Sequence, residues 1–94
     1  MPSEVLQKIF KHRQRLPWQT VENHTVIVEP DKNFTHELDE VASFVWERIN
    51  GQRTIAEISQ EVCGEFTVDE TTAINDVANF AVELESKGLL VCQN

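Results

Sequence analysis

Short runs of apolar and β-branched residues alternate with turn signals in the first part of the chain. The runs Trp18–Val21 and 25–28 are separated by the turn-like residues 22–24, and this pattern predicts a hairpin. Residues 30–33 include a proline, an aspartate and an asparagine, which predict a second turn. The segment Phe34–Leu38 then alternates apolar and polar side chains, as is typical of a third strand. A sheet this small buries one face only when helices pack against it.

From Asp39 the apolar period lengthens to about 3.6 residues, which is the period of an α-helix. Asp39 is a good N-cap, because its carboxylate can accept hydrogen bonds from the free N–H groups of the first turn. Gly51 is a typical residue for the end of this helix. Thr54 and Glu57 then match a capping box at the start of a second helix. The pattern therefore predicts two consecutive helices with a short connection.

A third helix is predicted from a cap at Thr67 or Asp69 to about Lys87, with Gly88 as its terminator. Its apolar residues form two neighbouring lines instead of one stripe. The first line contains Ala73, Val77, Phe80 and Leu84. The second line contains Ile74, Ala78 and Ala81, and Val82 extends it toward Asn75 and Asn79. The first line is expected to face the other helices. The second line either completes the core or floors a shallow groove beside an exposed strand.

Three strands followed by three helices predict an α+β fold, winged-helix-like, with a three-stranded antiparallel sheet followed by a three-helix unit. The length of 94 residues is that of one domain, expected over residues 17–94. Residues 1–16 are expected to be an N-terminal tail or a short helix, with a docking helix for a partner as the alternative. Four apolar residues recur there at helical spacing: Val5, Leu6, Ile9 and Phe10.

The charge is unevenly distributed along the chain. The net charge is −8, and half of the basic residues lie between Lys8 and Arg15. The acidic remainder would repel a phosphate backbone, so no nucleic-acid partner is expected. The acidic body either serves solubility or favours a basic partner surface. Apolar runs are too short for a membrane span and no signal peptide is apparent, so we expect a cytoplasmic protein with Cys63 and Cys92 reduced.

The residues that usually perform catalysis are scattered. The three histidines, His12, His24 and His36, fall in the N-terminal segment, a turn and a strand, and no cysteine lies near them in sequence. The two cysteines are far apart and no metal-binding spacing occurs. All three glycines lie at expected helix ends, so none forms a phosphate-binding loop. We therefore expect a protein that is not an enzyme and that uses no metal or cofactor.

A three-stranded sheet leaves an edge unpaired, and the segment Phe34–Leu38 is the natural candidate. An open edge is a template for the addition of a foreign strand. Charged side chains usually block such edges, and Glu37 is the only charged residue in this segment apart from the histidine. The same edge could pair with a second copy of the chain, so a homodimer through the edge strand is a further prediction.

Residues 36–46, 50–58, 76–80 and 87–90 resemble the PqqD family in the order and spacing of their motifs. The family pattern has a Leu-Asn pair, an alanine, an aliphatic-Trp pair, a glycine before a threonine-capped helix and a C-terminal Gly-Leu-Leu. This chain has Asp39 where the family commonly has asparagine, and both are good N-caps. The resemblance implies a recognition element for ribosomally made precursor peptides, with three strands and three helices.

Such a protein binds the leader of the precursor and presents it to a modifying enzyme, often a radical SAM protein. The leader is expected to add to the third strand and to pack against the third helix. On this sequence the resemblance implies a strand half of the site made of Phe34, Thr35, His36, Glu37 and Leu38. The helix half inferred for the same site contains Ile74, Asn75, Ala78, Ala81, Val82 and Glu85.

A winged-helix DNA-binding regulator is the alternative function, because the three-helix layout resembles a helix-turn-helix. Recognition helices read bases with Arg, Lys, Asn or Gln. The third helix offers only Asn75, Asn79 and Lys87 for this purpose, among several acidic residues. The peptide-binding adaptor is therefore the preferred prediction.

Overall fold

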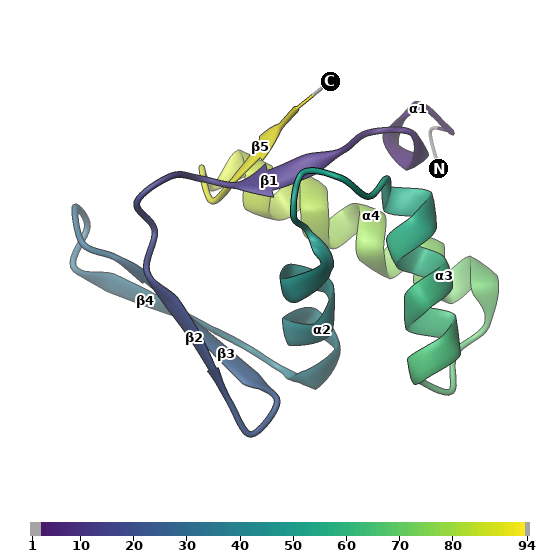
Figure 1. Cartoon of the computed structure of the whole chain (residues 1–94), viewed down its shortest axis with the longest axis horizontal. Coiled ribbons are helices and arrows are strands. Elements are labelled where there is room, and N and C mark those ends of the chain that lie inside the picture. Colours follow the sequence, from purple (N-terminus) through teal and green to yellow (C-terminus); the bar gives the residue numbers. More distant parts are fainter. Residues whose placement is uncertain (1–2, 94) are drawn as a thin grey trace.

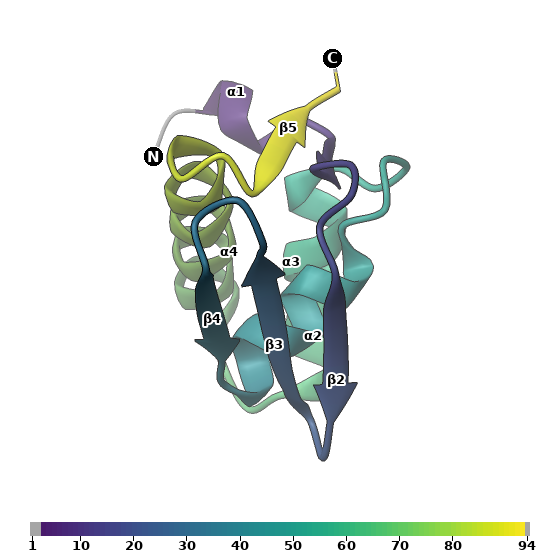
Figure 2. The ribbon, with the colours of Figure 1, turned by 90° about the vertical axis from the view of Figure 1, so that its left-hand side faces the viewer.

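The computed structural model describes residues 3–93, and its larger sheet has three antiparallel strands (Figures 1 and 2). The strands are β2 (Trp18–Val21), β3 (His24–Glu29) and β4 (Phe34–Leu38), in the order β2-β3-β4. All three predicted strands are confirmed. Figure 2 shows the strands in front and the helices behind, so the helices cover one face of the sheet.

Two residues in left-handed backbone conformation close the β2–β3 hairpin. Glu22 and Asn23 have φ angles of 52° and 67°, and Val21 pairs with His24 across them. Two-residue loops with positive φ at both positions match the right-handed twist of the flanking strands. Asn23 suits this conformation, whereas Glu22 adopts it at some cost. This loop fixes the register from Val21↔His24 to Trp18↔Ile27.

The three predicted main helices are confirmed as α2 (Glu40–Arg48), α3 (Ile55–Glu65) and α4 (Glu70–Ser86). Asp39 caps α2, because its Oδ1 accepts a hydrogen bond of 2.9 Å from the Ala42 N–H. Thr54 and Glu57 form the complete capping box of α3. For α4 the alternatives are now resolved: the cap is Asp69, which accepts from the Thr72 N–H at 2.7 Å.

The N-terminal segment differs from the helical face that its spacing predicted. A short helix, α1 (Ser3–Leu6), is present, but Phe10 lies beyond it in a strand, β1 (Phe10–His12). Strand β1 pairs antiparallel with β5 (Leu90–Cys92), which gives a second, two-stranded sheet near both chain ends (Figure 1). Phe10 is buried in the core. Residues 10–12 are therefore part of the folded domain and not a frayed tail.

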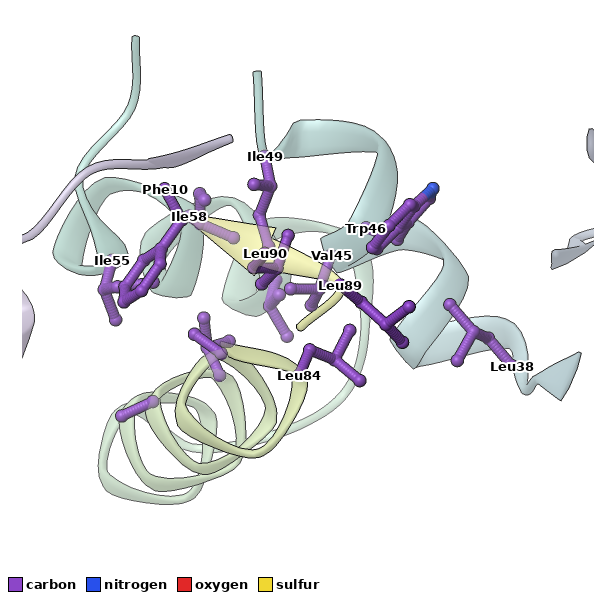
Figure 3. Close-up of a cluster of buried hydrophobic side chains, with 14 of the residues drawn as sticks. Phe10, Leu38, Val45, Trp46, Ile49, Ile55, Ile58, Leu84, Leu89 and Leu90 are labelled. Atoms are coloured by element: carbon purple, nitrogen blue, oxygen red, sulfur yellow. The ribbon is translucent and has the colours of Figure 1, made fainter. Parts of the chain in front are cut away.

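The core lies mainly among α2, α3, α4 and the β1–β5 pair, and Ile27 and Leu38 join it from the three-stranded sheet (Figure 3). Trp46 of α2 is its largest member and is fully buried. Ile55 and Ile58 of α3 and Leu89 beside β5 contribute further buried side chains. Burying side chains of this size stabilises the fold by about 1.5–3 kcal/mol each. The fold is thus a mixed α+β arrangement of antiparallel strands and helices, and within residues 3–93 no helix is long and apolar enough to cross a membrane.

Candidate functional site

The outward backbone groups of β4 follow from the pairing of the strands. The Val28 N–H donates to the Pro17 carbonyl at 2.9 Å, so the backbone of Val28 points toward β2. Successive residues of a strand direct their hydrogen-bonding groups to opposite sides. Val28 lies opposite Thr35 in the ladder, and Val26 lies opposite Glu37. The N–H and C=O groups of Thr35 and Glu37 therefore point away from β3, toward the open edge.

A groove of about 430 Å³ lies beside this edge, between β4 and the C-terminal half of α4. All five residues of β4 line it. Phe80, Glu83 and Leu84 of α4 form the opposite wall with Lys87, the C-cap residue of that helix. Asp39 and Ala42 also line the groove. The groove thus combines an open strand edge with a wall of apolar and charged side chains.

The strand half of the predicted site lies in this groove, whereas the helix half does not. Ala78 and Ala81 are buried in the core at 1% and 0% exposure. Ile74 is half-buried. The remaining three residues of the predicted helix half are exposed on other parts of the α4 surface: Asn75, Val82 and Glu85. None of the six lines the groove. Ala78 and Val82 therefore do not floor a groove beside β4, which corrects the expectation from the sequence.

The first apolar line of α4 is confirmed as core: Ala73, Val77 and Leu84 are buried, and the half-buried Phe80 packs against them. Phe80 and Leu84 also border the groove. The residues that sequence reasoning missed are Phe80, Glu83 and Lys87. Their spacing of three and four residues follows one side of the helix. Along this side of the helix, large apolar side chains alternate with charged ones. Such a pattern in the sequence indicates a helix side that is partly exposed and can line a groove.

A serine side chain holds β4 beside β3 where the two strands separate. The Thr25 N–H donates to the Ser43 Oγ at 2.8 Å, and the Ser43 hydroxyl donates to the Leu38 carbonyl at 3.2 Å. Ser43 lies on α2 and is buried. Thr25 and Leu38 lie opposite each other in the ladder. The Ser43 hydroxyl therefore takes the place of a direct hydrogen bond between the Thr25 N–H and the Leu38 C=O. Helix α2 thereby fixes the position of the C-terminal end of β4 beside the groove.

A charge cluster lies at the other end of β4. Glu29 is buried, and its Oε2 accepts a hydrogen bond of 2.6 Å from His36 Nε2. Lys32 and Arg13 lie within 3.6 and 3.7 Å of Oε1. The His36 hydrogen bond, with the charges of Lys32, His36 and Arg13, holds the pKa of Glu29 below its ordinary value despite burial. Phe34 packs edge-on against His36, with ring centroids 4.9 Å apart, so this cluster orders two groove residues.

A second titratable group lies near β2. The His12 ring stacks on Trp46 with centroids 3.8 Å apart and meets Trp18 edge-on at 5.3 Å. Its Nε2–H donates to the Trp46 carbonyl at 2.8 Å. Burial lowers the pKa of His12 because the charged ring would lose its hydration, and this outweighs the carbonyl hydrogen bond. The stacking and the hydrogen bond of His12 hold β1 against α2. His12 lies outside the groove.

The described residues offer little else for chemistry. No three His, Cys, Asp or Glu side chains in residues 3–93 gather in a way that could hold a metal ion. Cys63 and Cys92 are half-buried and form no disulfide bond with each other. The arrangement that distinguishes this surface is therefore the open edge of β4 beside the α4 wall, which suits the binding of an extended chain.

A protein-family model described as coenzyme PQQ synthesis protein D (PqqD) matches residues 24–90. The chain belongs to the PqqD family. A PqqA binding protein from Xanthomonas oryzae pv. oryzae (strain PXO99A) is 34% identical over 76 residues, which cover 81% of this chain and 80% of the relative. The resemblance seen in the sequence is thus confirmed.

Two solved structures share the fold. TbiB1 in complex with the TbiA(β) leader peptide matches with a TM-score of 0.77 and 25% identity, over 85% of this chain and 93% of that one. The PqqD truncation of Methylobacterium extorquens PqqCD, described as a stand-alone recognition element for ribosomally synthesised and post-translationally modified peptides, matches with a TM-score of 0.72 and 21% identity, over 88% of each chain. These matches offer no support for the alternative of a DNA-binding regulator.

Proposed function

We propose that this chain is a non-catalytic adaptor that binds the leader segment of a ribosomally made precursor peptide and presents it to a modifying enzyme. The observation that carries the proposal is the open edge of β4 beside the α4 wall. The leader-peptide complex of TbiB1 and the PqqA-binding relatives support the same class of ligand. A radical SAM enzyme is the modifying partner that we expect.

The guest segment binds as a fourth strand beside β4. Its backbone pairs with the outward N–H and C=O groups of Thr35 and Glu37, and these hydrogen bonds are independent of the guest's side chains. Selectivity comes from alternate guest side chains that face α4. There Phe80 and Leu84 offer apolar contact, while Glu83 and Lys87 form an ion pair of 3.0 Å at the rim. Phe34 is 56% exposed and supplies apolar surface from the strand side.

An NMR titration tests this mode of binding. The probe is a synthetic peptide, chosen as the most enriched sequence from a displayed library of random peptides selected on the whole chain. We expect the largest amide shift changes at residues 34–38 and at Phe80, Glu83 and Lys87. Small changes are expected at Asn75, Val82 and Glu85 on the other sides of α4. Saturable binding that leaves residues 34–38 unperturbed would contradict the proposal.

A further inference from the structure

A second hollow of about 410 Å³ continues the groove along the helices. It lies between the first half of α2 and the middle of α4. The two hollows share the lining residues Asp39, Ala42, Phe80 and Glu83, so they adjoin each other. A guest strand that runs along β4 to Leu38 therefore leads into this second hollow. We call it the α2–α4 hollow.

The α2–α4 hollow has an apolar floor and an acidic rim. Val41 and Ala42 of α2 and Val77 and Phe80 of α4 are among its apolar lining residues. The charged residues of its lining are all acidic: Asp39, Asp76 and Glu83. Lysine and arginine combine an aliphatic stem with a charged end, so they match a hollow of this kind.

The three carboxylates of the rim differ in the hydrogen bonds and ion pairs that they already make. Glu83 pairs with Lys87 at 3.0 Å. Asp39 uses Oδ1 to cap α2, which leaves its second oxygen for another donor. The Asp76 carboxylate is exposed and makes no hydrogen bond or ion pair within residues 3–93. Asp76 and Asp39 are thus the rim groups with capacity for a cation.

The basic residues of the chain body are committed elsewhere. From residue 16 onward only four basic residues occur. Lys32 pairs with Glu29, and Lys87 pairs with Glu83. Arg48 and Arg53 both pair with Glu61, at 3.3 and 2.8 Å. Within residues 16–93 each of these four cations pairs with a glutamate, and Asp76 makes no ion pair. The lining of the α2–α4 hollow therefore carries net negative charge.

From this charge and shape we propose that the α2–α4 hollow is a specificity subsite for one lysine or arginine side chain of the bound peptide. The stem of that side chain lies on Ala42 and Phe80, and its charged end lies between Asp39 and Asp76. The inference rests on the proposed peptide-binding function, because the guest reaches the hollow from the edge of β4. It adds to that function the chemical class of one guest residue.

Parallel peptide selections test the subsite. Random displayed peptides are selected on the parent chain, on the double variant Asp39→Asn/Asp76→Asn and on the control Glu85→Gln. Asparagine keeps the capping ability of residue 39, and Glu85 is an exposed carboxylate of α4 outside both hollows. We expect a lysine or arginine at a constant distance from the extended apolar segment in peptides selected on the parent and on Glu85→Gln. That preference should disappear on the double variant.

Affinities of one selected peptide complete the test. Replacing its basic residue by glutamine should weaken binding to the parent about three- to fivefold, the size of a partly exposed ion pair. The same replacement should leave affinity for the double variant unchanged. Peptides that bind without a basic preference, or an equal loss on both proteins, would overturn the subsite while leaving the proposed function intact. Failure to select any binding peptide would instead contradict the proposed function itself.

Discussion

The sheet has two outer strands, and they differ in what lies beside their open edges. Strand β2 borders two smaller hollows, one of about 70 Å³ that includes Thr20 and one of about 190 Å³ that includes Trp18 and Gln19, whereas β4 borders the groove of about 430 Å³. Figure 2 shows the two strands at opposite sides of the sheet. By the same alternation along the strand, the outward groups are those of Thr20 on β2 and of Thr35 on β4. An unpaired edge is therefore not a binding site by itself. In the proposed mode of binding, the wall formed by α4 makes the edge of β4 selective.

The attachment of β4 to α2 can be broken at Ser43. The substitution Ser43→Ala leaves the Thr25 N–H and the Leu38 C=O without their shared partner in a buried place. We expect the free energy of unfolding to fall by about 2–3 kcal/mol, because buried unpaired polar groups are costly. Urea unfolding measures the change. The matched control is Ser59→Ala, another buried serine, whose hydroxyl bonds only to the Ile55 carbonyl in its own helix and should cost much less. Equal losses in the two variants would contradict the bridging role.

The two sides of α4 can be compared by truncating one apolar residue on each. Phe80→Ala removes contact area from the groove wall, and we expect the selected peptide to lose about 1–2 kcal/mol of binding free energy. Val82→Ala changes an exposed residue outside the groove and should leave binding unchanged. Calorimetric titration measures both affinities, with the melting temperature of each variant as a check on folding. A larger loss for Val82→Ala would favour the site first expected from the sequence.

Acid should weaken the β4 side of the sheet through Glu29. Its pKa is lowered in the folded state, so the unfolded chain takes up the proton first as the pH falls. The stability that Glu29 contributes is present above its ordinary pKa near 4.5 and is lost as the pH falls through the folded value. Unfolding free energies measured from neutral to acidic pH should fall less steeply in Glu29→Gln than in the parent chain. Parallel curves for the two proteins would contradict this coupling.

The β2 side should respond at a higher pH through His12, with the smallest effect. Burial lowers its pKa from 6.5, so the unfolded chain binds a proton before the folded chain does. Stability is full above about pH 6.5 and declines below that value until the folded pKa is passed. His12→Phe, which keeps an aromatic ring beside Trp46, should remove this decline. If the unfolding free energy of His12→Phe still declines as steeply between neutral pH and the ordinary pKa of Glu29 near 4.5, another titratable group causes the decline.

Local signals in the sequence were enough to predict most elements. The runs of β2 and β4 were predicted at their observed ends, and the caps at Asp39 and Thr54 were correct, because each depends on neighbours within a few residues. Strand β1 was missed since its partner β5 is far along the chain, with Phe10 opposite Cys92. Three residues provide no local alternation that would distinguish a strand from a helical face.

Of the groove lining, the sequence predicted only the strand side. The edge of β4 could be found because a three-strand sheet must have open edges. The wall could not, since both lines of α4 are apolar and the rotation of the helix about its axis depends on packing against α3 and β5. For the second line of α4 the sequence left two alternatives open, the core or a groove floor formed by Ala78 and Val82. In the structure Ala78 is buried in the core, and Val82 is exposed outside the groove.

The most direct test of the account places proline at each open edge. Thr35→Pro removes an N–H that points away from β3, so the sheet should tolerate it as edge strands do. Thr20→Pro removes the corresponding N–H of β2, and it also removes the hydroxyl that lies 2.6 Å from Thr25 Oγ1, so the folding of this variant is checked by its melting temperature. With the selected peptide as ligand, isothermal titration should show affinity at least about tenfold weaker for Thr35→Pro, the size of one lost hydrogen bond of about 1.4 kcal/mol. Thr20→Pro should bind like the parent chain. Unchanged binding by a folded Thr35→Pro variant, or a loss confined to Thr20→Pro, would contradict strand addition at β4.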